Sequence, residues 1–152
     1  MQLSLYADYS CRVLIYLAVM TEEKTSIREI SEAYGISTNH LVKVVHNLGK
    51  LGYVHTTRGR GGGISLGKPA TEISIGQVIR DTESGFSLVG CFQNKDLCPI
   101  TPVCGLKGIL GHALREFLNV LDQYTLAEIA RDSSDLRRIF QTQLLAKQNT
   151  ES

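Results

Sequence analysis

Three cysteines in the second half of the chain are the residues best suited to chemistry. They stand in the stretch Cys91-Phe-Gln-Asn-Lys-Asp-Leu-Cys98-Pro-Ile-Thr-Pro-Val-Cys104, with six residues between the first pair and five between the second. Zinc sites usually bring cysteines together in Cys-x-x-Cys pairs, because a tight turn sets the tetrahedral geometry. A wider spacing suits a larger group, and thiolates are the usual ligands of iron–sulfur clusters. The spacing therefore favours an iron–sulfur cluster over a zinc ion.

The loop offers three thiolates, whereas an iron–sulfur cluster usually has four ligands. The fourth ligand must come from elsewhere in the chain, from a second subunit or from solvent. Pro99 and Pro102 stiffen the second gap. Cys104 precedes a long apolar helical pattern and is expected at a helix N-terminus, where backbone dipoles favour a thiolate. A disulfide-based redox switch is the alternative that this spacing leaves open.

The composition is that of an ordinary globular protein, with 43% hydrophobic and 20% charged residues. No apolar run approaches the roughly 18 residues of a membrane span, and the N-terminus lacks the features of a signal peptide. We therefore expect a cytoplasmic protein without a membrane partner, in which structural disulfides are rare. The fourth cysteine, Cys11, falls in the apolar stripe of a predicted helix, which favours a core position.

The net charge is only +1, but the charges are unevenly distributed. No acidic residue occurs between Glu32 and Glu72. This acid-free segment carries cations and histidines: Lys43, Lys50, Arg58, Arg60 and Lys68, with His40, His46 and His55. A basic segment inside a near-neutral protein is suited to binding a polyanion. A chance run of like charges on a solvated face is the alternative.

The acid-free segment overlaps the pattern of a helix-turn-helix. Ser26 and Glu29 have the spacing of a capping box at a helix start. Gly35 is suited to ending that helix, and Ser37 to beginning the next. Two helices joined by a tight turn with glycine are typical of this motif. The second helix has one apolar stripe, made of Leu41, Val44, Val45 and Leu48.

The other face of that second helix has only amides, imidazoles and cations. A surface helix usually mixes acidic and basic groups, whereas amides and cations read base edges and phosphates in the major groove. We therefore predict a recognition helix, in which Asn39 and His40 reach base edges. An ordinary amphipathic surface helix is the alternative. The predicted DNA contacts from this helix are Ser37, Thr38, Asn39, His40, Lys43 and Lys50.

A β-hairpin is predicted after the recognition helix. Residues 53–57 and 64–66 have the pattern of strands, and 58–63 form the loop between them. Three successive glycines let this loop lie close against another surface. Arg58 and Arg60 place charge at its tip, where arginines commonly enter a narrow minor groove. The Walker spacing of a nucleotide-binding loop is absent, so the hairpin is interpreted as the wing of a winged helix.

The remainder of the chain divides into three parts. Residues 71–105 contain a short helix and the cysteine loop, 106–140 a long helix and shorter ones, and 141–152 a polar tail that we expect to be flexible. The apolar band of the long helix is wider than one small domain needs. We therefore predict a mainly α fold: a winged helix-turn-helix over 1–70, with a two-stranded wing, and a long C-terminal helix that forms a homodimer. An intrachain core is the alternative role of this band.

In combination, these motifs resemble the winged-helix iron–sulfur regulators that include NsrR and IscR, up to about residue 140. The resemblance is carried by Asp8-Tyr9-Ser10, by the Arg-Gly-Arg-Gly-Gly-Gly-Ile wing, by Ile-Gly-Gln-Val-Ile and by Cys98-Pro-Ile-Thr-Pro-Val-Cys104-Gly-Leu-Lys. Within that family the chain is most similar to the NsrR type, the nitric oxide-sensitive repressors. Lys107 stands where IscR-type proteins have a histidine ligand. Asn39-His40 and the stretch 121–126 are also similar to the NsrR type.

The resemblance implies that Cys91, Cys98 and Cys104 hold an iron–sulfur cluster, of the [4Fe-4S] rather than the [2Fe-2S] type. It implies that Asp8 of the partner subunit supplies the fourth ligand, a plain helix cap being the alternative for this residue. Many relatives have five residues between the first two cysteines, where this chain has six. The resemblance further implies a repressor of transcription that leaves double-stranded operator DNA when nitric oxide nitrosylates the cluster.

Other functions remain open at this stage. An iron- or redox-responsive regulator, or a thiol-switch or zinc-stabilised one, would have the same fold. A small electron-transfer protein would leave the acid-free helix and the wing unexplained. We do not expect an enzyme, because the sequence has no Ser/His/Asp order, paired carboxylate motif or nucleotide loop.

Overall fold

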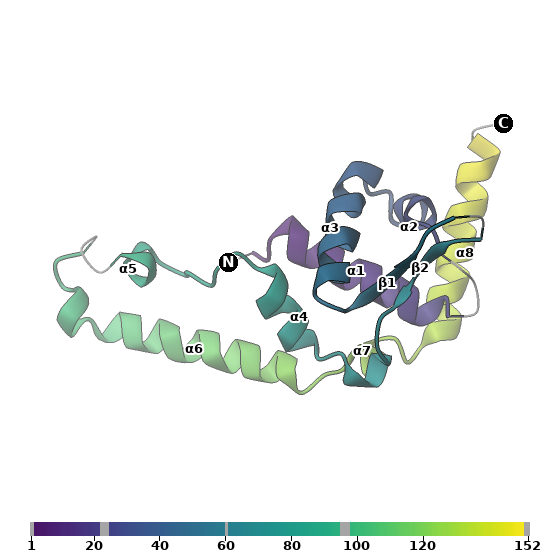
Figure 1. Ribbon diagram of the computed structural model, residues 1–152. Coiled ribbons are helices and arrows are strands. Elements are labelled where there is room, and N and C mark those ends of the chain that lie inside the picture. The colour runs from purple at the N-terminus through teal and green to yellow at the C-terminus, as the bar shows by residue number, and fades with distance from the viewer. Residues whose placement is uncertain (1, 22–24, 60, 95–97, 151–152) are drawn as a thin grey trace.

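The structure, a computed structural model, describes residues 2–21, 25–59, 61–94 and 98–150. It confirms the predicted mainly α fold with one two-stranded antiparallel sheet (Figure 1). The N-terminal elements are α1 (Leu5–Val19), α2 (Ile27–Tyr34), α3 (Thr38–Lys50), β1 (Val54–Thr57) and β2 (Gly63–Leu66). They are followed by a 3-10 turn (Ala70–Glu72), α4 (Ile75–Thr82), α5 (Gly90–Gln93), a second 3-10 turn (Thr101–Val103), α6 (Gly105–Asp122), α7 (Leu126–Ile129) and α8 (Ser133–Thr150).

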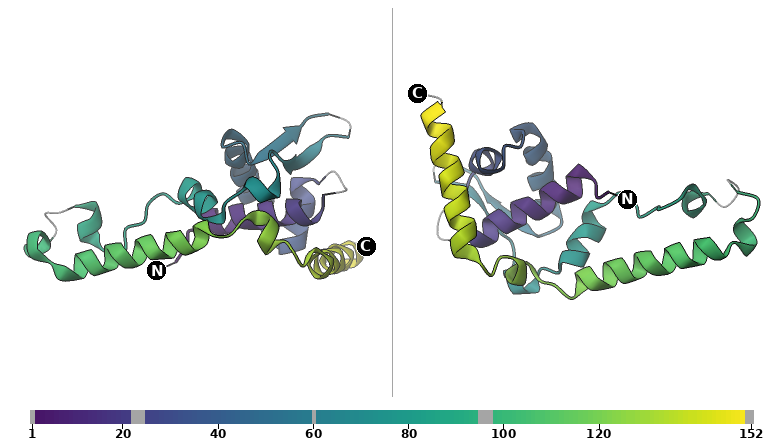
Figure 2. Two further views of the ribbon diagram at one scale, coloured as in Figure 1. Left: turned by 90° about the horizontal axis from the view of Figure 1, so that it is seen from below. Right: turned by 180° about the vertical axis from the view of Figure 1, so that it is seen from behind.

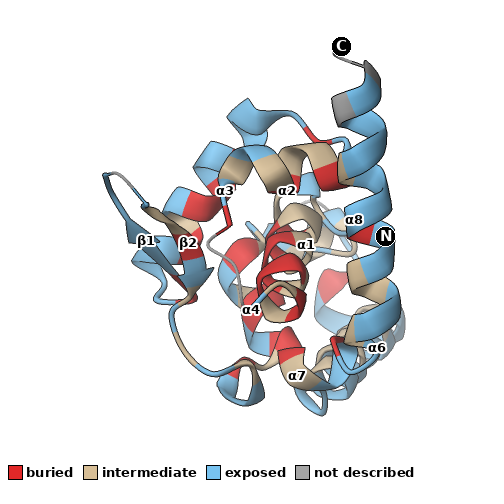
Figure 3. Cartoon of the chain, turned by 90° about the vertical axis from the view of Figure 1, so that its right-hand side faces the viewer, coloured by how far each residue is buried: buried red, intermediate tan, exposed pale blue. Residues whose placement is uncertain are grey.

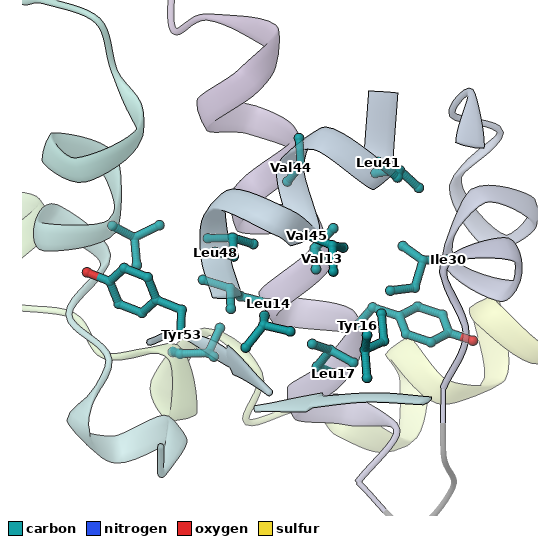
Figure 4. Close-up of a cluster of buried hydrophobic side chains, with 14 of the residues drawn as sticks. Val13, Leu14, Tyr16, Leu17, Ile30, Leu41, Val44, Val45, Leu48 and Tyr53 are labelled. Carbon is teal, nitrogen blue, oxygen red and sulfur yellow. The ribbon is translucent and has the colours of Figure 1, made fainter. Parts of the chain in front are cut away.

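Helix α1 lies at the centre of the body, and Figure 3 shows buried residues concentrated on it. It packs against α3, α4, α7, α8 and β2. Val13, Leu14 and Tyr16 are at most 1% exposed, and Figure 4 shows them among side chains from several elements. The sequence predicts a single buried stripe through Cys11 and Leu14. The observed burial is wider, because neighbours surround α1 on several sides.

The ends of α2 follow the predicted local chemistry. Ser26 and Glu29 form the capping box, in which the Glu29 carboxylate accepts from the Ser26 N–H at 2.5 Å and the Ser26 hydroxyl accepts from the Glu29 N–H at 3.2 Å. Gly35 ends the helix with a φ of 64°, a left-handed conformation that favours glycine.

The start of α1 differs from the prediction. Ser4 is its N-cap, and the Ser4 hydroxyl accepts from the Ala7 N–H at 3.1 Å. Asp8 lies inside the first turn. The helix cap that the sequence leaves as an alternative role for Asp8 is therefore wrong, because Ser4 is the N-cap. The Asp8 carboxylate pairs instead with Arg12, one turn further along.

The hairpin matches the predicted wing. β1 and β2 pair antiparallel, from Val54 opposite Leu66 to Thr57 opposite Gly63. Gly59 and Gly61 have φ values of 96° and 74°, which L side chains adopt rarely. The glycine-rich loop thus makes a turn whose backbone conformation most other residues would adopt only with strain.

Helix α4 is joined tightly to the end of α6. The Ile75 N–H donates to the Tyr124 carbonyl at 3.0 Å, and the Leu126 N–H donates to the Ile73 carbonyl at 2.8 Å. A Cβ atom at Gly76 would overlap the Asp122 carboxylate, so that only glycine permits this approach. Beyond α4, α6 projects away from the body, with α5 lying alongside it (Figure 2).

The C-terminal region is more ordered than expected. Helix α8 runs to Thr150 and so covers most of the predicted tail. Leu136, Phe140 and Leu144 recur every four residues and pack on the core, where α8 contacts α2 and α1. This stripe explains why the helix continues past residue 140. No helix among the described residues is both long enough and apolar enough to cross a membrane.

Phe140 should be the side chain that anchors α8. It is 4% exposed, and its ring centroid lies 4.8 Å from that of Tyr16 and 5.2 Å from that of Tyr34. We expect Phe140→Ala to lower the free energy of unfolding by about 3–5 kcal/mol, because it leaves a cavity. The neighbouring exposed Gln141→Ala should change it by less than about 0.5 kcal/mol. Urea denaturation measures both, and equal small effects would contradict the docking of α8.

Candidate DNA interface and cysteine loop

Helix α3 has the two faces that the sequence predicts. Leu41, Val44, Val45 and Leu48 are all at most 3% exposed. The predicted DNA contacts of this segment are all exposed: Ser37, Thr38, Asn39, His40, Lys43 and Lys50. The Ser37 hydroxyl makes no capping hydrogen bond, whereas the Thr38 hydroxyl donates to Ser31 Oγ at 3.0 Å. The structure therefore leaves a polar, cationic helix face open to a ligand.

The first turns of α1 lie against this recognition helix. The Tyr6 hydroxyl donates to the Lys43 carbonyl at 3.4 Å. The ring centroids of Tyr9 and His40 lie 6.3 Å apart. A hollow of about 200 Å³ separates the two helices and is lined by Leu5, Tyr6, Tyr9, His40, Lys43 and Val44. The position of α3 is thus set partly by the helix that carries Asp8.

The wing adds cationic and imidazole groups beside α3. Arg58 is exposed at the end of β1, whereas Arg60 lies outside the described residues. A hollow of about 360 Å³ between α3 and β1 is lined in part by His46, Lys50 and His55. The two histidines are not among the DNA contacts that the sequence predicts. Because both histidines belong to the acid-free segment, the sequence could have indicated them as further candidate DNA contacts.

The cysteine loop runs beside α6. Cys91 lies on α5, Cys98 precedes the second 3-10 turn, and Cys104 is the N-cap of α6, as predicted. All three are half-buried and free of disulfides. Among the described residues, no group of three or more His, Cys, Asp or Glu side chains is arranged to hold a metal ion. Residues 95–97, between the first two cysteines, lie outside the described residues, and the ligand set stays a prediction.

The surroundings of Cys104 nevertheless fit an anionic, thiolate-bound group. A hollow of about 480 Å³ beside it is lined by Phe92, Lys107, Gly108, Gly111 and Arg115. Lys107 and Arg115 supply positive charge. Gly108 and Gly111 have no side chains that would fill the hollow. Thr101 Oγ1 is buried with no hydrogen-bond partner among the described residues. The hollow therefore combines the Cys104 thiol with two cations of α6, and the unsatisfied Thr101 hydroxyl lies three residues before Cys104 in the chain.

Asp8 lies on the body rather than on the cysteine loop. Arg12 Nε is 2.9 Å from Asp8 Oδ2, and the two side chains are 43% and 38% exposed. The Asp8 carboxylate is thus accessible from outside its own chain. Cys11, one turn away, packs on the core as predicted. Burial, together with the nearby Asp8 charge, raises the pKa of the Cys11 thiol to about 11, which suits a structural residue.

Comparisons with known proteins confirm the family resemblance. Residues 3–132 match the Rrf2 family, described as iron-dependent transcriptional regulators. The chain is 52% identical over 141 residues to the HTH-type transcriptional regulator NsrR of Bacillus subtilis (strain 168), covering 91% of this chain and 97% of that protein. It is 50% identical over 141 residues to the protein of the same name in Geobacillus kaustophilus (strain HTA426), covering 91% and 96%.

Solved structures agree with this family. The structure of T. potens IscR matches with a TM-score of 0.70 and 25% identity, covering 88% of each chain. CymR of B. subtilis, titled the global cysteine regulator, matches with a TM-score of 0.65 and 28% identity, covering 86% of this chain and 97% of that one. The match over most of the chain, together with the winged helix and the cysteine loop, shows that the chain belongs to the Rrf2 family of transcriptional regulators.

Proposed function

We propose that the protein is a homodimeric transcriptional repressor that binds operator DNA and releases it in response to nitric oxide, through an iron–sulfur cluster held by Cys91, Cys98 and Cys104. The observation that carries the proposal is the place of Cys104. It joins the cysteine loop to the N-terminus of α6, a helix none of whose residues is buried. A change at the loop can therefore act directly on the contact between two subunits.

The DNA-binding part rests on the exposed face of α3 and on the wing. Asn39 and His40 are exposed near the start of α3 and would reach base edges in the major groove. Lys43, Lys50 and Arg58 are exposed cations that can neutralise phosphates. The two sets of contacts contribute differently to binding: base contacts give sequence preference, and phosphate contacts give most of the affinity.

The dimer rests on the uncovered apolar face of α6. None of its residues is buried, and Leu106 and Ile109 are 61% and 67% exposed. A second copy that covered these side chains would gain about 25 cal/mol for each Å² of apolar surface removed from water. To bind two half-sites one turn of DNA apart, such a two-fold dimer would hold its recognition helices about 34 Å apart.

The proposed cluster is of the [4Fe-4S] type, with Asp8 of the partner subunit as fourth ligand. When bound, such a cluster supplies iron atoms that react with nitric oxide. Asp8 is accessible and shares α1 with Tyr6 and Tyr9, which contact α3. A change in the position of Asp8 would therefore be passed to the recognition helix. Coupling between two such sites is typically about 1–3 kcal/mol.

Replacing Lys43 should weaken DNA binding without changing sequence preference. We expect Lys43→Ala to reduce the affinity for all duplexes alike, and to reduce the slope of log K against log salt by about one for each phosphate that the protein no longer neutralises. Lys147→Ala, on the exposed surface of α8, is the matched control. Gel shift over a series of salt concentrations measures both. An unchanged salt dependence for Lys43→Ala would remove this residue from the interface.

Replacing Cys104 should abolish the cluster, whereas replacing Cys11 should not. We expect anaerobically purified Cys104→Ala to lose its iron and acid-labile sulfide. Cys11→Ala should keep both, because that thiol belongs to the core. Iron, zinc and sulfide are measured for each chain. Stoichiometric zinc without iron in the unaltered protein would favour the zinc-stabilised alternative.

The response to nitric oxide is tested by one titration. Anaerobic protein should absorb broadly in the visible range, and the spectrum and the DNA affinity should change together as nitric oxide is added. The probe is a duplex selected from a random-sequence pool by the untreated protein. A spectrum that changes while the affinity stays constant would separate the cluster from regulation. Release by a thiol oxidant in protein free of iron would instead support the thiol switch.

A further inference from the structure

Tyr53 connects three elements that bear on DNA. Its N–H donates to the Leu48 carbonyl of α3 at 2.9 Å, and its carbonyl accepts from the Gly67 N–H, just after β2, at 2.8 Å. Its hydroxyl donates to Asp81 Oδ2 on α4 at 2.6 Å. The side chain is 2% exposed. One residue at the base of the wing is thus bonded to the recognition helix, to the end of the hairpin and to α4.

The chain around Tyr53 is packed closely enough to fix the base of the wing. A Cβ atom at Gly67 would lie 2.5 Å from the Gly52 carbonyl oxygen, so that only glycine fits there. The Lys68 ammonium lies 4.4 Å from the centroid of the Tyr53 ring. Burial and the Asp81 carboxylate raise the pKa of Tyr53 above its usual value, so the hydroxyl remains a hydrogen-bond donor near neutral pH.

Helix α4 links this base to α6. Asp81 follows Arg80, whose guanidinium makes a bidentate pair with the Asp122 carboxylate at the end of α6, with one contact at 2.7 Å. Adjacent residues of a helix point about 100° apart, so that one turn can reach two different neighbours. The α4–α6 junction is also held by the backbone hydrogen bond between Ile75 and Tyr124.

We infer that α4 positions the wing, with Tyr53–Asp81 joining it to the base of the wing and Arg80–Asp122 joining it to α6. The inference rests on the proposed function in so far as the wing must contact DNA. The inference goes beyond the proposed function because it connects α6 to the wing through α4, by a route that does not include α1. Tyr53 and Asp81 are positioning residues, since they act through the wing rather than by touching DNA.

Tyr53→Phe tests this connection, because it removes the hydroxyl and leaves the ring for Lys68 and the core. We expect the affinity for a duplex selected by the unaltered protein to fall roughly three- to tenfold, the effect of one hydrogen bond. The slope of log K against log salt should fall by about one for each phosphate that the displaced wing no longer reaches. Preference for the selected duplex over one with altered bases in the major groove should stay the same, because α3 is not displaced.

Variants at Asp81 provide the controls. Asp81→Asn keeps an acceptor oxygen for Tyr53 and should bind as the unaltered protein does, whereas Asp81→Ala removes the acceptors of both Tyr53 and Gln77 and should weaken binding at least as much as Tyr53→Phe. The double variant Tyr53→Phe/Asp81→Ala should be no weaker than Asp81→Ala alone, as expected if both changes break the same Tyr53–Asp81 bond. Urea denaturation reports stability separately.

Two outcomes would overturn the inference. The first is unchanged affinity and salt dependence in Tyr53→Phe. The second is a lower stability with an unchanged salt dependence, which would mark the pair as merely structural. Failure of the proposed function looks different, since the unaltered protein would then select no duplex at all, and the inference would fall with it.

Discussion

The apolar side chains of α1 are buried on several sides, and packing against them fixes the positions of the surrounding elements. Val13, Leu14 and Tyr16 are almost inaccessible to water, and α3, α4, α7, α8 and β2 all pack against the helix. Since apolar burial is the main favourable term in folding, no neighbour can move far without exposing part of this core. At the first turn of α1, which lies against α3, Leu5 and the Asp8 side chain are 61% and 38% exposed and so remain accessible to another molecule.

Helix α6, unlike α1, is not surrounded by other elements in the described part of its own chain. It is as apolar as a core helix, yet none of its residues is buried within the chain. A single helix of this length is marginally stable in water by itself. Helix α4 packs against it at one end, and the proposed second subunit would cover the remainder. The cysteine loop lies at the end away from α4 (Figure 1). The loop is therefore placed at the least supported part of the molecule, where a bound group would have the largest effect on order.

Local chemistry explains which features the sequence predicts well. The capping box of Ser26 and Glu29, the left-handed Gly35 and the glycine-rich hairpin depend on residues close together in the chain, and each matches the structure. The start of α1 is harder to predict, because Ser4 and Asp8 are both good N-terminal residues and only one can be the cap. The polar composition of the last helix favours a flexible tail, and it hides the apolar stripe that packs this helix on the core.

The features that the sequence could not predict depend on distant contacts. The Tyr53–Asp81 bond joins residues 28 positions apart, and no periodicity indicates which carboxylate a buried tyrosine will meet. The cysteines are a different case, since their spacing predicts a shared ligand but not their geometry. Under the proposed function that geometry would depend on the bound group and on a residue from another subunit, neither of which belongs to a local pattern.

The two connections to the DNA-binding surface affect different parts of binding. Tyr6 and Tyr9 contact α3, whose exposed amide and imidazole side chains would read bases under the proposed function. Tyr53 holds the base of the wing, which would contribute mainly through phosphates and the minor groove. A change in α1 should therefore reduce sequence preference, and a change passed through α4 should reduce affinity for any duplex. Because α1 carries Asp8 and Cys104 is the N-cap of α6, one event at the cysteine loop would, under the proposed function, act on both helices at once. A repressor needs that combination, since losing preference alone would leave it bound elsewhere on DNA.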